Sequence, residues 1–315
     1  MSLRIALLAA ALLFVVSEAE GQLLPFTHYT PEREINALPS AEVHKVYQDR
    51  LGYIWFAIYS SGLVRYDGVN MINYGTGSGL RDVTVWDMIE DPTGRLWVSS
   101  NAGLMVSKYP LTEYEVGERI TFIAESNDIH IIDVTVSHNK MTVSESGWLW
   151  VGTESLGVIR YRFTGEDKLE ADTLSLGNFG EKGGTTVRSL VARKDGSVWV
   201  SLLDGHIVQY NSDGNTQFHE TGSGINTNAL FESDDGRLWG GEQEGRIWRL
   251  QESGDEYAFL EVSNRLNSNI SNISSDEAGN IWVSSEGTGL LKIDPNLAEQ
   301  PINYRRNNGL LSEIV

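Results

Sequence analysis

The segment DRLGYIW at residues 49–55, followed by GLVRYDG at residues 62–68, indicates the architecture of the whole chain. The alternating residues 43–47 before it end at an aspartate-to-glycine turn, where Asp supplies a side-chain acceptor and Gly permits a positive φ. Each of the two quoted segments is expected to contain one strand. Asp67-Gly68 then signals a further hairpin into residues 71–74. Residues 43–74 are therefore predicted to form one unit of four antiparallel strands that pair in sequence order.

This unit recurs along the chain. Six of the nine tryptophans share one frame, with a glycine three residues before, an aliphatic residue directly before and a second glycine six or seven residues after. They are Trp55, Trp97, Trp150, Trp199, Trp239 and Trp282. Their spacings of 42, 53, 49, 40 and 43 residues match a four-stranded propeller blade and exceed the ~20–35 residues of solenoid repeats.

The repeat predicts an all-β fold, a β-propeller of four-stranded antiparallel blades with six complete blades and the start of a seventh. A lone four-stranded sheet cannot bury both of its faces, so neighbouring blades must stack face to face, and a large aromatic at one fixed position suits that seam. We therefore expect the framed tryptophans to be core residues first. An exposed, sugar-stacking role is the alternative for some copies.

The repeats resemble a known family, the two-component regulator propeller repeat of bacterial hybrid sensor kinases and related regulators. The resemblance covers essentially all of the mature chain and is carried by residues 49–55 with 62–68, by 91–97 and by 276–282. Departures occur in the third unit, where Ser144 replaces the turn Asp, and in the fifth, where Gly240-Gly241 replaces the usual aliphatic-Gly pair. Such departures are expected to weaken individual blades without changing the assignment.

The resemblance implies an extracytoplasmic, ligand-sensing region that reads a small-molecule cue, commonly an oligosaccharide, and passes it to a regulator module. The family often continues with a linker domain, a membrane helix and a kinase, which would lie in cis beyond Val315. Contact with a membrane is then expected only through that later segment. A homodimer is an open alternative.

The two ends of the chain carry their own predictions. Residues 1–21 read as a secretory signal peptide, with Arg4 before a short apolar run, so the mature propeller at 22–315 is expected to be exported to the periplasm. Residues 24–30 look like an orphan outer strand that closes the last blade, and residues 309–315 like the start of blade seven. We therefore expect a fragment of a longer reading frame, with an incomplete ring.

Charge and cysteine content exclude several classes of function. The 43 acidic and 24 basic side chains give a net charge of −19, which disfavours binding to nucleic acid. The absence of cysteine excludes disulfides, thiolate metal sites and a Cys nucleophile. The acidic residues 165–172 are expected to form an exposed loop insertion.

The sequence favours a binding protein over an enzyme. Its six histidines include no pair at metal-ligand spacing, so we expect no catalytic residue, no metal and no cofactor. The alternatives are a periplasmic propeller lyase resembling streptogramin lyases and a secreted scaffold or binding propeller. A lyase would need a His-Glu and metal constellation, for which His206 near Asp204 is the only candidate.

A ligand is expected on the face built from the loops between the second and third strands, since rigid rings present function on loops. Positions four or five after each framed tryptophan occupy those loops and form a polar, partly acidic ring suited to sugar hydroxyls. The predicted ligand-binding residues are Tyr59, Asn101, Glu154, Asp204, Gln243 and Glu286.

Overall fold

The computed structural model of the protein describes residues 37–115, 117–124, 131, 140–164, 168–174, 186–253, 256–262, 266, 268–308 and 310. The predicted signal peptide at 1–21 and closing strand at 24–30 lie outside these residues, as does the start of blade seven at 309–315 except for Leu310. Those assignments, and with them the closure of the ring, stay predictions.

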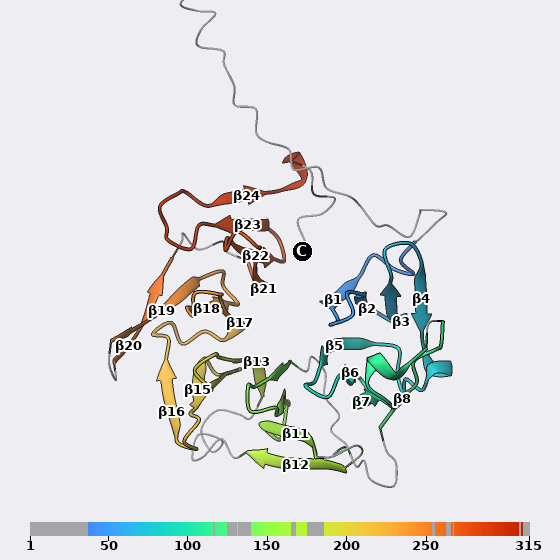
Figure 1. The fold of residues 1–315 in the computed structure, drawn as a ribbon. Coiled ribbons are helices and arrows are strands. Elements are labelled where there is room, and N and C mark those ends of the chain that lie inside the picture. Colours follow the sequence, from blue (N-terminus) through green and yellow to red (C-terminus); the bar gives the residue numbers. More distant parts are fainter. Residues whose placement is uncertain are drawn as a thin grey trace, which may run out of the picture.

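The predicted all-β propeller with four-stranded antiparallel blades is confirmed, with six blades arranged around a common centre (Figure 1). The first three blades comprise β1 (Val43–Gln48), β2 (Ile54–Ile58), β3 (Gly62–Tyr66) and β4 (Met71–Tyr74); β5 (Val85–Glu90), β6 (Leu96–Ser100), β7 (Gly103–Ser107) and β8 (Phe122–Ile123); and β9 (Met141–Val143), β10 (Leu149–Gly152), β11 (Val158–Thr164) and β12 (Lys168–Leu174).

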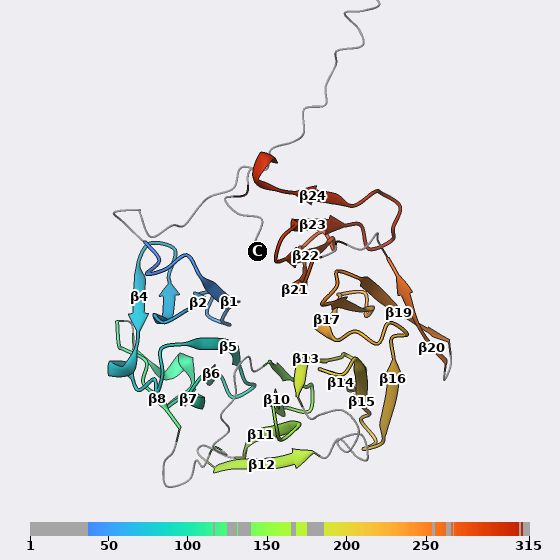
Figure 2. The same cartoon turned by 180° about the vertical axis from the view of Figure 1, so that it is seen from behind.

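The next three blades comprise β13 (Val187–Ala192), β14 (Val198–Leu202), β15 (His206–Tyr210) and β16 (Thr216–Glu220); β17 (Thr227–Glu232), β18 (Leu238–Glu242), β19 (Ile247–Ser253) and β20 (Glu256–Glu261); and β21 (Ile270–Ser275), β22 (Ile281–Ser285), β23 (Gly289–Ile293) and β24 (Ile302–Tyr304). The first strands of successive blades contact each other from β1 to β21 around the centre, and the fourth strands lie outermost (Figure 2).

Helical structure in the described ranges is confined to short 3₁₀ turns, η1 (Thr76–Ser78), η2 (Leu111–Glu113) and η4 (Arg306–Asn308). No helix there reaches the length and apolar character needed to cross a membrane. The predicted acidic loop at 165–172 is wrong in part, because residues 168–172 belong to β12. Two of its acidic side chains form ion pairs across the hairpin, Asp172 with Arg160 at 2.8 Å and Glu170 with Arg162 at 3.1 Å.

The aspartate at the start of the repeat ties the turn to the tryptophan. In the first blade one carboxylate oxygen of Asp49 accepts the backbone N–H groups of Leu51 and Tyr53 at 3.0 and 2.9 Å. The other oxygen accepts the indole N–H of Trp55 at 2.7 Å. The same indole bond joins Trp97 to Asp91 at 2.8 Å and Trp282 to Asp276 at 2.9 Å. One side chain therefore shapes the hairpin and satisfies a polar group that the seam removes from water.

In the other three blades a serine hydroxyl accepts the indole N–H of the framed tryptophan. Ser144, Ser197 and Ser233 accept the indole N–H groups of Trp150, Trp199 and Trp239 at 3.3, 3.1 and 3.2 Å. In the fourth and fifth blades that serine donates in turn to Asp195 and Asp235, both at 2.6 Å. The departure noted at Ser144 is thus one of three, and each keeps the indole bonded.

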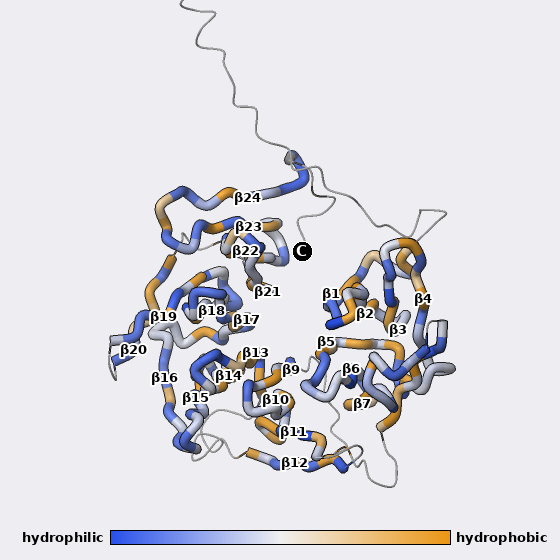
Figure 3. The backbone as a smooth tube through the Cα atoms, in the orientation of Figure 1, coloured by the Kyte–Doolittle hydropathy of each residue, from blue (hydrophilic) through white to orange (hydrophobic). Residues whose placement is uncertain are grey.

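The framed tryptophans of the first five blades pack against the following blade. Trp55 lies in a buried cluster with Val85 and Met88 of β5, and Trp97 in one with Met141 of β9. Trp150, Trp199 and Trp239 make the equivalent contacts further round the ring. These five side chains are at most 6% exposed, whereas Trp282 of the sixth blade is half-buried. The hydrophobic residues are accordingly spread over all the blades (Figure 3).

The residue two positions after each framed tryptophan is always small: Ala57, Ser99, Gly152, Ser201, Gly241 and Ser284. A Cβ atom on Gly152 would lie 2.4 Å from Val187, and one on Gly241 would lie 2.3 Å from Ile270. The next blade therefore approaches too closely for a larger side chain. The requirement for glycine at position 240 has a different origin. A Cβ atom there would lie 2.0 Å from Trp248, whose buried indole fills this space.

We predict that Asp91→Ala lowers the free energy of unfolding by about 3 kcal/mol, because the buried indole N–H of Trp97 loses a charged acceptor. Asp213→Ala is the matched control: Asp213 also caps a turn, at Asn215, but it is exposed and bonds no tryptophan. It should cost about 1 kcal/mol or less. Urea unfolding of both variants is the measurement, and equal losses would contradict the role given to the indole bond.

A second prediction concerns His219, which stacks on Trp199 at 4.8 Å and pairs with Gln209 at 2.9 Å. Burial lowers the pKa of His219 below its usual 6.5. The folded protein therefore binds this proton less readily than the unfolded chain, and stability should fall as the pH drops below about 6.5. His219→Phe should flatten this part of a plot of unfolding free energy against pH. An unchanged slope in the variant would assign the dependence to other groups.

Candidate functional site

The six residues predicted to bind a ligand occupy equivalent places on one face of the propeller. Each lies in the loop after the second strand of its blade. Five of these loops bond to the residue that precedes the first strand of the same blade, whereas Glu154 bonds to Thr186, which precedes the first strand of the next blade. The backbone N–H groups of Tyr59, Asn101, Gln243 and Glu286 donate to the carbonyls of Glu42, Thr84, Asn226 and Asn269 at 3.0, 3.2, 3.1 and 3.0 Å. In the fourth blade Leu203, next to Asp204, donates to Thr186 at 3.0 Å, and the Thr186 hydroxyl donates to the carbonyl of Glu154 at 2.8 Å.

Two of the predicted residues are joined by a cluster of aromatic side chains. The imidazole of His44 stacks on the indole of Trp86 with ring centres 4.4 Å apart and an interplanar angle of 2°. The ring of Tyr59 packs against His44 with ring centres 5.6 Å apart and an interplanar angle of 59°. The indole N–H of Trp86 donates to Asn101 at 2.8 Å. Tyr59 and Asn101 thus lie at the two ends of one platform that spans blades one and two.

Hydrogen bonds fix the orientation of His44 within the platform. Its Nδ1–H donates to the carbonyl oxygen of Val85 in the next blade at 2.9 Å. The Nε2 atom lies 3.6 Å from the carboxylate of Glu42. The phenol of Tyr59 is 43% exposed, so the platform presents an aromatic surface beside polar groups. Such a surface suits a ring-shaped ligand that needs both stacking and hydrogen bonds.

His44 and Trp86 were not identified from the sequence, although a local signal exists. The register of the first strand shifts between Val43 and Lys45 and between Val85 and Asp87, which places a β-bulge at each of these residues. A bulge redirects one side chain while the strand continues, and bulges are common beside functional sites. The same shift recurs in three other blades. The five bulge residues are His44, Trp86, Arg188, Asn228 and Ser271, and all are partly exposed.

Elsewhere on this face the predicted residues lie in separate polar groups. Asp204 lines a cavity of about 240 Å³ with His206 and Glu220. His206 Nδ1 lies 3.1 Å from Asp204, and its Nε2 lies 3.7 Å from Glu220. Even so, no group of three or more His, Asp or Glu side chains in the described part of the chain is arranged to hold a metal ion. His28, His130 and His138 are outside that part.

Gln243 and Glu286 flank a chain of amides. Asn226 donates to Asn228 at 2.7 Å, and Asn228 donates to Asn269 of the next blade at 2.5 Å. The structure therefore brings the six predicted residues to one face, and among the described contacts it is Tyr59 and Asn101 that are joined through aromatic side chains.

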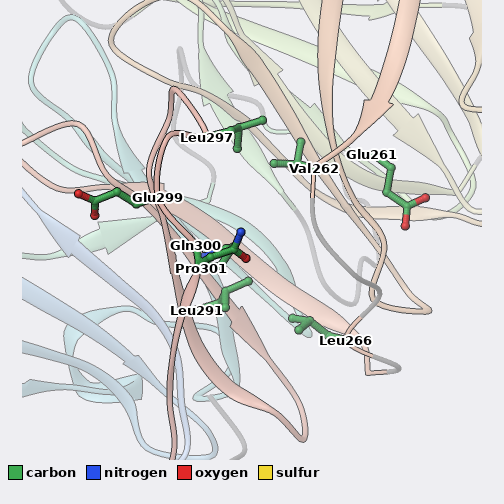
Figure 4. Close-up of a pocket in the computed structure, with 8 residues that line it drawn as sticks. All are labelled: Glu261, Val262, Leu266, Leu291, Leu297, Glu299, Gln300 and Pro301. Atoms are coloured by element: carbon green, nitrogen blue, oxygen red, sulfur yellow. The ribbon is translucent and has the colours of Figure 1, made fainter. Parts of the chain in front are cut away.

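A cavity of about 620 Å³ lies between blades five and six. Its apolar side chains are Val262, Leu266, Leu291, Leu297 and Pro301, and Figure 4 shows Glu261 and Glu299 at its margins. Gln300 completes the lining. None of the six predicted residues contributes to it.

Comparison with known proteins supports the repeat assignment and the fold. Residues 79–102, which contain β5 and β6, match the family model described as the two component regulator propeller. The extracellular domain of one hybrid two component system from B. thetaiotaomicron superposes with a TM-score of 0.66 at 21% identity, over 88% of this chain and 36% of that one. A second such domain from this organism superposes with a TM-score of 0.66 at 19% identity, over 87% of this chain and 36% of that one.

A virginiamycin B lyase from Staphylococcus aureus has the same fold, with a TM-score of 0.63 and 15% identity over 84% of both chains. The chain thus spans about a third of the length of the two extracellular domains and most of the length of the lyase. No curated protein matches the sequence.

The aromatic platform predicts a spectroscopic signature. Stacking at 4.4 Å places the His44 ring protons in the shielding region of the Trp86 indole, so their NMR signals should move upfield. Trp86→Ala should return these signals to ordinary values without lowering the melting temperature strongly, because Trp86 is partly exposed. Phe218→Ala on β16 is the control and should leave them in place. Chemical shifts of the His44 ring protons that do not change in Trp86→Ala would contradict the stacked geometry.

Proposed function

Because the chain carries the two-component regulator propeller repeat, we propose that it is the extracytoplasmic ligand-sensing propeller of a signal transduction regulator. Export through residues 1–21, a periplasmic location and linker and kinase domains in cis belong to this proposal. The likeness in fold to the extracellular domains of two hybrid two component systems supports it. This region binds and does not catalyse.

The observation that carries the proposal is the aromatic platform on the face of the predicted loops. Trp86 and Tyr59 offer ring surfaces, while Asn101 and Glu42 offer hydrogen-bonding groups beside them. Oligosaccharides combine flat apolar ring faces with hydroxyl groups, so they fit this combination. The loops at Glu154, Asp204, Gln243 and Glu286 extend the polar surface around the same face.

The test is a binding screen of the purified protein against a panel of neutral and acidic oligosaccharides. A sugar that binds should lose at least about tenfold in affinity with Trp86→Ala. Phe218→Ala, which removes an exposed aromatic from the outer strand β16, should leave the affinity unchanged. In the native host, Trp86→Ala in the chromosomal gene should abolish the transcriptional response to that sugar.

Two results would redirect the assignment. Cleavage of a streptogramin B antibiotic by the protein, lost with His206→Ala, would favour a propeller lyase. Sugar binding with no transcriptional response would favour a secreted scaffold or binding propeller. Equal affinity of the wild-type protein and Trp86→Ala would remove the platform from the proposal.

A further inference from the structure

Arg65 of β3 is held among aromatic rings on the opposite side of the first blade. The carbon at the centre of its guanidinium lies 4.6 Å from the ring centre of Tyr53, 5.8 Å from Trp55 and 5.9 Å from Tyr74. Rings at these distances stabilise the cation and fix its plane, but they accept no conventional hydrogen bonds from its N–H groups. Those donors need acceptors from another source.

No acceptor comes from the described residues. The Nε atom of Arg65 is buried without a hydrogen-bond partner, and no ion pair joins the guanidinium to a described carboxylate. An arginine is among the residues least often left unpaired in a partly buried position. Arg65 therefore keeps an N–H donor that no described residue engages and that a bound ligand can satisfy.

The third blade contains a carboxylate partner for its arginine that the first blade lacks. Arg160 occupies the same register position as Arg65, opposite the framed tryptophan on the third strand. Arg160 donates from Nε and Nη2 to Asp172, at 3.1 and 2.8 Å, from the directly opposing position on the fourth strand. In the first blade that opposing position holds Ile72. The in-blade carboxylate that neutralises Arg160 is thus replaced by an apolar side chain beside Arg65.

Arg65 lines a cavity. The space measures about 310 Å³ and lies between the first blade and the segment that joins β7 to β8. Its other walls are Leu51, Tyr53, Leu111 and Tyr114, with Thr112, Glu115 and Gly117 completing the lining. This volume is within the range of small-molecule sites, and the combination of apolar walls with one placed cation is typical of them.

We propose that this cavity is a second binding site, for a small molecule that carries a carboxylate next to a ring or apolar group. The carboxylate takes the place that Asp172 occupies beside Arg160, and the tyrosines contact the attached ring. Carboxylate is favoured because its two oxygens match the planar fork of a guanidinium. The site lies at the turn between β1 and β2, at the opposite end of the strands from the proposed sensing platform, and does not depend on that platform's function.

Glu115 is the one acidic side chain among the described residues that line the cavity. It is exposed and forms no ion pair with a described residue, so it lowers the local preference for anions without neutralising Arg65. Replacing it with glutamine should strengthen the binding of a carboxylate. The affinity of an uncharged ligand should not change with this substitution.

The test uses benzoate and D-glucuronate as probes, with benzamide and D-glucose as neutral counterparts, in ligand-observed NMR titrations. Arg65→Gln should weaken binding of the charged probes by at least about tenfold. Ile72→Asp should do the same while the arginine stays in place, because it recreates the pairing of the third blade. Arg160→Gln is the matched control and should leave the affinity unchanged. Melting curves establish that each variant is folded.

Several results would overturn the proposal. One is the failure of both charged probes to bind the wild-type protein; another is equal binding of the neutral counterparts. Equal binding of inorganic sulfate would show an unspecific anion site. Full binding by folded Ile72→Asp would show that Arg65 acts only as a packing residue. Loss of oligosaccharide binding with Trp86→Ala is independent of all these outcomes.

Discussion

The hydrogen bond that the indole of each framed tryptophan makes near the first turn of its blade is the interaction on which the ring depends. A seam between two sheets must be apolar, yet tryptophan brings an N–H group whose burial costs free energy unless it finds an acceptor. Asp49, Asp91 and Asp276 supply it directly, and serines supply it in the other blades. Because the same aspartate also holds the backbone of the hairpin, seam packing and strand pairing are coupled in the three blades that have it.

This arrangement separates the parts of the chain that support the ring from those that vary. Seam positions are restricted in size, as Gly152 and Gly241 illustrate by their close approach to the next blade. The loops after the second strands and the bulges in the first strands carry no such restriction. Stacked rings at His44 and Trp86 can therefore occur on the same scaffold that has amides at Asn228 and Asn269.

Most of the fold was predictable because one frame repeats and each copy contains its own turn signals. The serine-mediated indole bonds were not, since Ser197 precedes its tryptophan by two residues and Ser144 by six. The platform was found only in part: Tyr59 and Asn101 follow from loop position, whereas His44 and Trp86 depend on a bulge that resembles ordinary strand alternation. Arg65 has no carboxylate opposite it in the blade because Ile72 holds that position, and this pairing can be found only from the strand register.

The bulge at the second position of the first strand has an evolutionary consequence. One residue is inserted there while the pairing on both sides continues, so its side chain does not set the register of the strand. Substitutions at such a position are tolerated by the scaffold and change mainly what the face presents to solvent. Five blades offer five of these positions, and new ligand preferences can arise by combining single substitutions among them without redesign of the fold.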